Sequence, residues 1–177
     1  MKNYKEFILN SLKNAEGFKF VKNPAFQVDE NHLLTEFKGG TFIISFNDNY
    51  DASRLNSTKS LVSPFTVNLP VILTEPFKSM PLFDKLIVSN HLNNKSSNLV
   101  RFSVRESLNM FIISAPYYPM LEQLSKDFFE EPVFNKKSGS FMVLSLLTMC
   151  WESSTTLTDD LNNYLKNPKK YYAEHQE

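Results

Sequence analysis

The segment from Phe77 to Phe129 constrains the fold more than any other part of the chain. Its pattern predicts an amphipathic helix, a two-strand hairpin and a second amphipathic helix, with almost no loop between them. One face of the first helix carries Leu82, Phe83, Leu86, Ile87 and Asn90, and the polar run 91–98 ends it. Strands are expected over 100–105 and 108–114. This order of elements indicates an α+β architecture.

A second hairpin is predicted nearer the N-terminus, after an amphipathic helix over residues 2–15 and a short apolar piece, 18–21, that is either a strand or a packed connection. Residues 32–38 and 41–47 alternate in polarity around Gly39-Gly40, which we expect to supply the positive φ angles of a tight turn. Phe42, Ile44 and Phe46 should then share one face. The polar stretch 48–63 is expected to form an exposed loop.

Residues 65–73 alternate without interruption and predict a further strand that contains Pro70. Proline has no N–H for a ladder, so we expect this strand at a sheet edge or at a bulge. An exposed edge could accept a partner chain as an added strand. Alternatively, Pro70 is there to block such pairing.

The C-terminal part is predicted to be helical. Residues 141–151 are apolar on nearly all sides, which favours a buried helix over a buried strand. Thr156 or Thr158 can cap a last helix that ends at Pro168. The chain is expected to form a single domain, 1–177, with an α+β core over 1–131, a helical extension over 132–167 and a frayed tail over 168–177. The predicted sheet has about five antiparallel strands, in the order α-β-β-β-α-β-β-α.

The composition points away from several classes of protein. Nineteen basic and nineteen acidic residues give no net charge, which argues against nucleic acid as a partner. The longest apolar run, 141–151, is too short to cross a membrane. The charged, amphipathic N-terminus lacks the unbroken apolar core of a signal peptide, so a cytoplasmic location is expected. The single Cys150 lies in an apolar run, as a small buried hydrophobe would.

No residue pattern indicates catalysis or a cofactor. The three histidines, His32, His91 and His175, are far apart and have no metal-ligand spacing around them, so we expect them at the surface. The Gly39-Gly40 pair lacks the strand–loop–helix context of a phosphate loop. We therefore expect a protein that is not an enzyme and that needs neither a metal nor a cofactor.

Two groups of residues are candidates for contact with a protein partner. The first is the apolar face of the expected edge strand, formed by Phe65, Val67, Leu69 and Val71. The second is Arg101 and Arg105, which share a strand face with Ser103. That pair is either a basic stripe facing a partner or part of a solvated sheet face.

The helix FDKLIVSNHLNN, the hairpin segments LVRFSVRE and LNMFIISAPYY, and the helix MLEQLSKDFF together resemble the type III secretion chaperone-like superfamily, which includes class I secretion chaperones and YbjN-type proteins. The resemblance covers about residues 2–131. It implies a non-enzymatic binder, often a homodimer, that holds an extended segment of a secreted effector along its sheet edge or hydrophobic surface. The neutral charge and the part from Phe141 onward differ from the family. The alternative is an immunity or antitoxin-type protein that caps a folded toxin.

Overall fold

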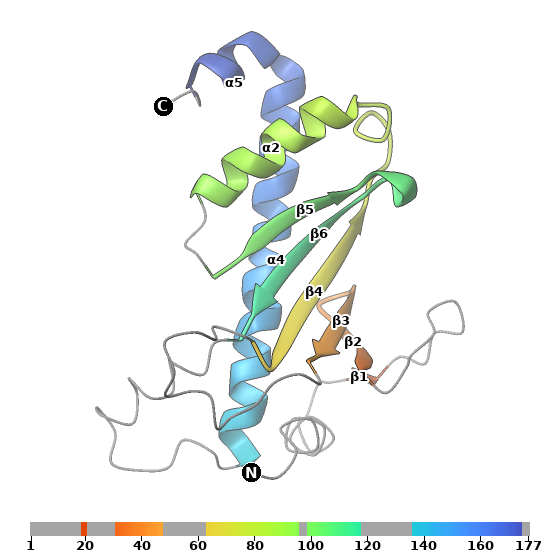
Figure 1. Cartoon of the computed structure of the whole chain (residues 1–177), viewed down its shortest axis with the longest axis vertical. Coiled ribbons are helices and arrows are strands. Elements are labelled where there is room, and N and C mark those ends of the chain that lie inside the picture. Colours follow the sequence, from red (N-terminus) through yellow and green to blue (C-terminus); the bar gives the residue numbers. More distant parts are fainter. Residues whose placement is uncertain (1–18, 21–30, 48–62, 96–98, 118–135, 175–177) are drawn as a thin grey trace.

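Six strands form one antiparallel sheet in the order β1-β2-β3-β4-β6-β5 (Figure 1). The structure is a computed structural model that describes residues 19–20, 31–47, 63–95, 99–117 and 136–174. The strands are β1 (Lys19–Phe20), β2 (His32–Phe37), β3 (Gly40–Phe46), β4 (Phe65–Ile72), β5 (Arg101–Arg105) and β6 (Met110–Pro116). The helices are α2 (Leu82–Lys95), α4 (Lys136–Lys166) and α5 (Pro168–Glu174), with a 3₁₀ turn η2 (Glu106–Leu108).

The predicted α+β class is confirmed. The short piece near Phe20 is a strand, β1, and raises the sheet to six strands. The helices expected at 2–15 and near 117–129 and most of the loop expected at 48–63 lie outside the described residues.

The β2–β3 hairpin is confirmed, but its turn lies one residue earlier than expected. Lys38 and Gly39 adopt the positive φ angles, 49° and 78°, whereas Gly40 already pairs with Phe37 at the start of β3. Gly40 is needed for space instead. A Cβ atom there would come within 3.2 Å of the Phe42 ring and 3.3 Å of the Trp151 ring.

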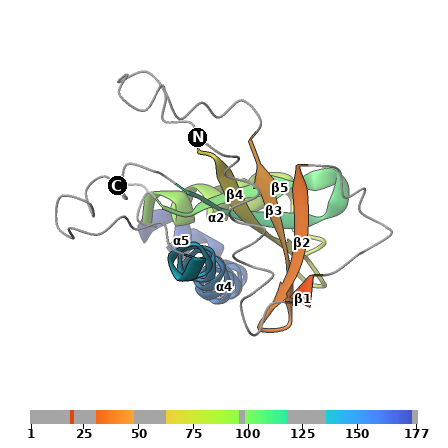
Figure 2. The same ribbon diagram turned by 90° about the horizontal axis from the view of Figure 1, so that it is seen from below.

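The core lies between the sheet and α4. Figure 2 shows α4 and α5 on one side of the sheet, and the inward residues of β3, β4 and β6 meet α4 there. The largest fully buried side chains are Phe42, Phe65, Phe111, Ile44, Leu92, Ile113, Leu147, Leu157, Leu161 and Val67. The predicted face of β3 is confirmed, since Phe42 and Ile44 are fully buried and Phe46 packs against the same core.

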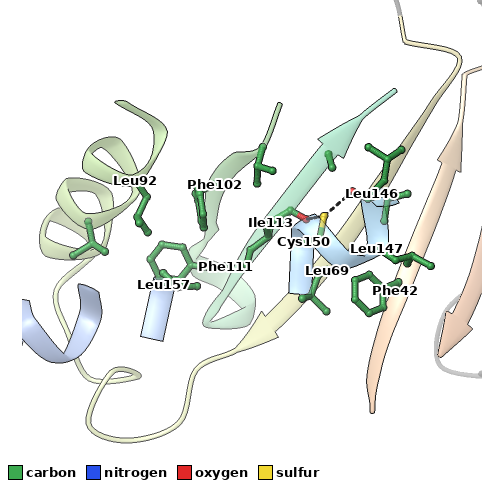
Figure 3. Packing of buried hydrophobic residues seen from close by; sticks show 14 of the residues in the cluster. Phe42, Leu69, Leu92, Phe102, Phe111, Ile113, Leu146, Leu147, Cys150 and Leu157 are labelled. Carbon is green, nitrogen blue, oxygen red and sulfur yellow. Dashed lines mark hydrogen bonds between the residues drawn. The ribbon is translucent and has the colours of Figure 1, made fainter. Parts of the chain in front are cut away.

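Cys150 occupies the centre of this core, as the sequence predicted (Figure 3). Its Sγ lies 3.7 Å from the carbonyl oxygen of Val67 and 3.8 Å from that of Ile113. Burial raises the pKa of the thiol to about 12, against a smaller lowering by the backbone of Ala115. A thiol that stays protonated at neutral pH is not a nucleophile.

The expected position of β4 at a sheet edge is wrong, because β4 is an interior strand. It pairs with β6 from Thr66 to Ile72 and with β3 from Phe65 to Asn68. Pro70 lies just beyond the last β3–β4 pair, on the part of β4 that pairs with β6 alone. The missing N–H of Pro70 therefore coincides with the end of the β3 ladder, which reconciles the proline with a central strand.

The face of α2 that carries Leu82, Phe83, Leu86 and Ile87 is not the one that the helix buries, although Ile87 packs partly against the core. The residues that the helix buries are Lys85, Val88, Ser89 and Leu92, whereas Phe83 is 68% and Leu86 42% exposed. The buried face includes the polar residues Lys85 and Ser89, whose hydrogen bonds hold the helix in place. Lys85 Nζ donates a hydrogen bond of 2.9 Å to the carbonyl of Lys78, and Ser89 bonds to β5.

The C-terminal part forms one helix where two were expected. The 31-residue α4 runs through the predicted break before Thr156, and Thr158 Oγ1 donates to the carbonyl of Ser154 within it instead of capping a new helix. Pro168 begins α5 rather than a frayed tail. Tyr171 of α5 is buried with its ring 5.4 Å from those of His91 and Tyr164.

Candidate functional site

The face of the sheet opposite α4 carries the exposed side chains that we take as the candidate site, and we call it the outer face. Strand register arranges its residues in rows across β4, β6 and β5. One row joins Asn68, Ser114 and Arg101, the next joins Pro70, Ile112 and Ser103, and the last joins Ile72, Met110 and Arg105. Of the described helices, α4 and α5 lie on the other side (Figure 2) and α2 packs along β5 and α4.

An apolar patch occupies the end of the outer face nearest the β5–β6 turn. We define it as Pro70, Ile72, Met110 and Ile112 of the outer face together with Leu108 of the adjoining turn η2. Ile72 is 71% and Leu108 is 61% exposed, while the other three are partly buried. Leu108 belongs to η2, which is fastened to the end of β4 by a hydrogen bond of 2.9 Å from the Leu73 N–H to the Asn109 carbonyl. Large apolar side chains gathered at an exposed surface are typical of an interaction site.

Two arginines flank the apolar patch on β5. Arg101, Ser103 and Arg105 are all exposed and share the outer face, as the sequence predicted. Arg105 pairs directly with Met110 of the patch. The two guanidinium groups therefore give one border of the patch a positive charge and donors suited to carboxylates.

The other predicted contact residues lie elsewhere. Phe65, Val67 and Leu69 are buried on the α4 side of β4, and Val71 is packed against the same core. The alternation of residues 65–73 was correctly predicted, but its apolar face is the inner one. Phe65, Val67 and Leu69 therefore stabilise the fold from within, and Val71 is only partly exposed.

A polar network that the sequence analysis missed fixes the middle of the outer face. Asn68 Nδ2 donates to Ser45 Oγ at 3.1 Å and to the Ile43 carbonyl at 3.3 Å. Ser114 Oγ donates to Asn68 Oδ1 at 2.8 Å. These bonds tie β3, β4 and β6 together through side chains. An asparagine inside an alternating strand was the available signal, since Asn is depleted from strands.

The edge of the sheet at β5 is closed by α2. Asn93 Nδ2 donates to the Phe102 carbonyl at 2.9 Å, and the Phe102 N–H donates to Asn93 Oδ1 at 2.8 Å. Ser89 Oγ donates to the same carbonyl at 2.9 Å. The amide of Asn93 thus takes the place that a neighbouring strand would fill. A partner strand cannot pair with Phe102 without displacing it.

Two pockets lie on the helical side of the sheet. One has a volume of about 350 Å³ and lies between the C-terminal half of α2 and the middle of α4. Its apolar lining residues include Leu92, Phe102 and Met149. The other, of about 440 Å³, lies where α2, α4 and α5 meet. His91, which was expected at the surface, is half-buried near that junction against Tyr171.

Within the described ranges, no three His, Cys, Asp or Glu residues are placed to hold a metal ion. Among the described helices, none combines the length and the apolarity needed to span a bilayer. No family model, no curated protein and no solved structure matches this chain.

Proposed function

We propose that this protein is a non-enzymatic binding module that holds a segment of another protein against its outer face. The observation that carries the proposal is the apolar patch, in which Ile72 and Leu108 are more than half exposed beside two arginines. Removing such side chains from water on binding favours a complex. The arginines select for carboxylates at the border. The partner segment is thus apolar and acidic.

The mode of binding differs from strand addition at β4. Main-chain pairing is unavailable along the interior part of β4, and Asn93 occupies the main chain of β5 at Phe102. Side chains of the outer face then make the contact. The patch lies on a rigid surface, because β4 and β6 pair along its whole length and the Asn68 network adjoins it. A preformed surface loses little conformational entropy when it binds.

A secretion-chaperone-like role is the specific form of the proposal, and the resemblance in the sequence supports it. This specific proposal includes a cytoplasmic location and a homodimeric state. In such a role the protein holds an unfolded segment of a secreted effector and catalyses no reaction. The buried thiol of Cys150 is in keeping with that.

The test is affinity purification of the tagged protein from its native host, with identification of what co-purifies. Three proteins are compared: the wild type, the double variant Ile72→Asp/Leu108→Asp, and the control Phe83→Asp. Phe83 is as exposed as the patch residues but lies on α2. We expect one partner to be retained by the wild type and the control and lost from the double variant.

The state of the partner decides between a chaperone and an immunity protein. Limited proteolysis of the complex should cleave the bound partner within an extended segment if the protein is a chaperone. A folded, protease-resistant toxin domain whose activity is inhibited would instead establish the immunity role. Retention of the partner by the double variant would show that the outer face is not the binding surface.

A further inference from the structure

The pocket between α2, α4 and α5 is lined by a buried carboxylate, one oxygen of which has no hydrogen-bond partner among the described residues. Asp160 lines this pocket and is only 6% exposed. Its Oδ2 atom is fully buried and has no hydrogen-bond partner among the described residues. Leaving a buried charged acceptor unsatisfied costs more than leaving a neutral one. A buried acceptor without a partner calls for an explanation, and a ligand in the adjoining pocket that supplies a donor is one such explanation.

Three lysines line the same pocket. Lys95 comes from the end of α2, Lys166 from the end of α4 and Lys170 from α5, and all three are exposed. Together with Asp160 they give the pocket more positive than negative charge. Lys95 and Lys166 lie in the last turns of their helices, where the helix dipole favours a cation even without a ligand. That explanation does not extend to Asp160, which lies six residues before the end of α4.

The negative charge of Asp160 acts on the neighbouring Tyr171 hydroxyl. Burial raises the pKa of the Tyr171 hydroxyl, and the negative charge of Asp160 raises it further. Tyr171 lines the pocket and remains a neutral phenol at physiological pH. Tyr171 therefore adds no negative charge to the wall of the pocket. Asp160 is the acidic residue that lines the pocket beside the three lysines.

The two signs of charge restrict the ligand. A metal ion would meet one carboxylate and three ammonium groups, which is a poor ligand set for any cation. A simple anion would suit the lysines but would meet Asp160. We infer that this pocket binds a small zwitterion, whose ammonium group donates to Asp160 and whose acidic oxyanion contacts the lysines. A volume of about 440 Å³ falls within the range of small-molecule sites.

A free amino acid is the simplest molecule with this chemistry, and an amino alcohol phosphate is the other source of it. The probes are the twenty standard amino acids and phosphoethanolamine, each added to the whole protein and followed by isothermal titration calorimetry. For any amino acid that binds, its N-acetyl and amide derivatives remove one charge at a time. We expect both derivatives to bind at least about tenfold more weakly, as loss of a charged hydrogen bond predicts. Binding by phosphoethanolamine alone would identify phosphate as the oxyanion.

The matched variants are Asp160→Asn and Asp159→Asn, because Asp159 is the exposed neighbour of Asp160 on α4. Without a ligand, Asp160→Asn should raise Tm by about 2–4 °C over the wild type, since it removes an unsatisfied buried charge. It should also abolish zwitterion binding. Asp159→Asn should change neither.

Three results would overturn the inference. The first is that none of the twenty-one probes binds. The second is equal binding by a probe and its N-acetyl derivative, which would show that the ammonium group is not recognised. The third is a Tm of Asp160→Asn at or below that of Asp159→Asn, which would show that the carboxylate is already satisfied within the fold. The pocket lies on the helical side of the sheet, so these results are independent of partner binding at the outer face.

Discussion

Asn93 of α2 and Phe102 of β5 pair through two reciprocal hydrogen bonds, of 2.9 Å and 2.8 Å, that imitate one step of a β-ladder. A helix side chain thereby closes the edge of a sheet. Exposed edges are sites of unwanted strand pairing, and natural sheets cover them. Ser89 adds a third bond to the same main-chain carbonyl. This closure leaves the main chain of Phe102 unavailable for strand addition.

Replacing Asn93 with alanine should destabilise the protein by about 1–3 kcal/mol, because the main-chain N–H of Phe102 loses its partner. Asn94→Ala is the control, since Asn94 is exposed on the same helix and gains the same helix propensity. Urea unfolding measures both changes. Hydrogen exchange at the Phe102 amide should also become faster in Asn93→Ala alone. Equal stability of the two variants would show that the Asn93 bonds contribute nothing.

Gly40→Val should destabilise the protein by about 1–3 kcal/mol through overpacking. The added side chain would enter the space held by the Phe42 and Trp151 rings. A double-mutant cycle with Trp151→Leu isolates this contact. We expect the cost of Gly40→Val to fall by at least about 0.5 kcal/mol in the Trp151→Leu background. Strict additivity of the two changes would place the strain elsewhere.

Cys150 should make stability depend on pH above the ordinary thiol range. Its pKa is raised from 9.0 to about 12, so only the unfolded chain releases the thiol proton between these values. Stability is therefore fully present below pH 9.0 and falls as pH rises, by at most about 1.4 kcal/mol per pH unit from this group. Urea unfolding should show a steeper fall in the wild type than in Cys150→Ala. Tyr171, whose pKa is also raised, contributes equally to both proteins.

Tyr171→Ala should lower the free energy of unfolding by about 3–5 kcal/mol, in the range for buried aromatic side chains. The ring is 4% exposed and meets His91 and Tyr164 edge to face. Lys169→Ala, at an exposed position of the same short helix, is the control. Chemical denaturation compares the two. If both variants are as stable as the wild type, α5 does not dock onto α2 and α4 in solution.

Serine substitutions should have different effects on stability in the apolar patch and in the core. Ile72→Ser and Leu108→Ser should each change stability by no more than about 0.5 kcal/mol, because both side chains are mostly in water already. Leu69→Ser should cost about 3 kcal/mol or more, since it creates a cavity and buries a hydroxyl in the core. Thermal unfolding monitored by circular dichroism checks all three. A large loss in Ile72→Ser would mean that the apolar patch is a structural contact.

Much of the local structure follows from the sequence. The hairpin around Gly39, the alternation along β4, the shared face of Arg101 and Arg105 and the burial of Cys150 were all predicted from residue patterns. These patterns reflect local rules, namely turn chemistry and the two-residue period of a strand. They depend little on which elements are neighbours.

The remaining features depend on contacts between distant segments, which periodicity does not record. The place of β4 inside the sheet follows from β6 pairing beside it, and the single helix α4 follows from the long sheet face that it covers. The orientation of α2 is set by Ser89 and Asn93, polar residues whose partner is the main chain of Phe102. The sequence by itself determined the strands from β2 to β6 and their alternating apolar faces. Only the tertiary structure decided which strand is the edge and which side of the sheet carries the apolar patch, because partners far apart in the chain make those choices.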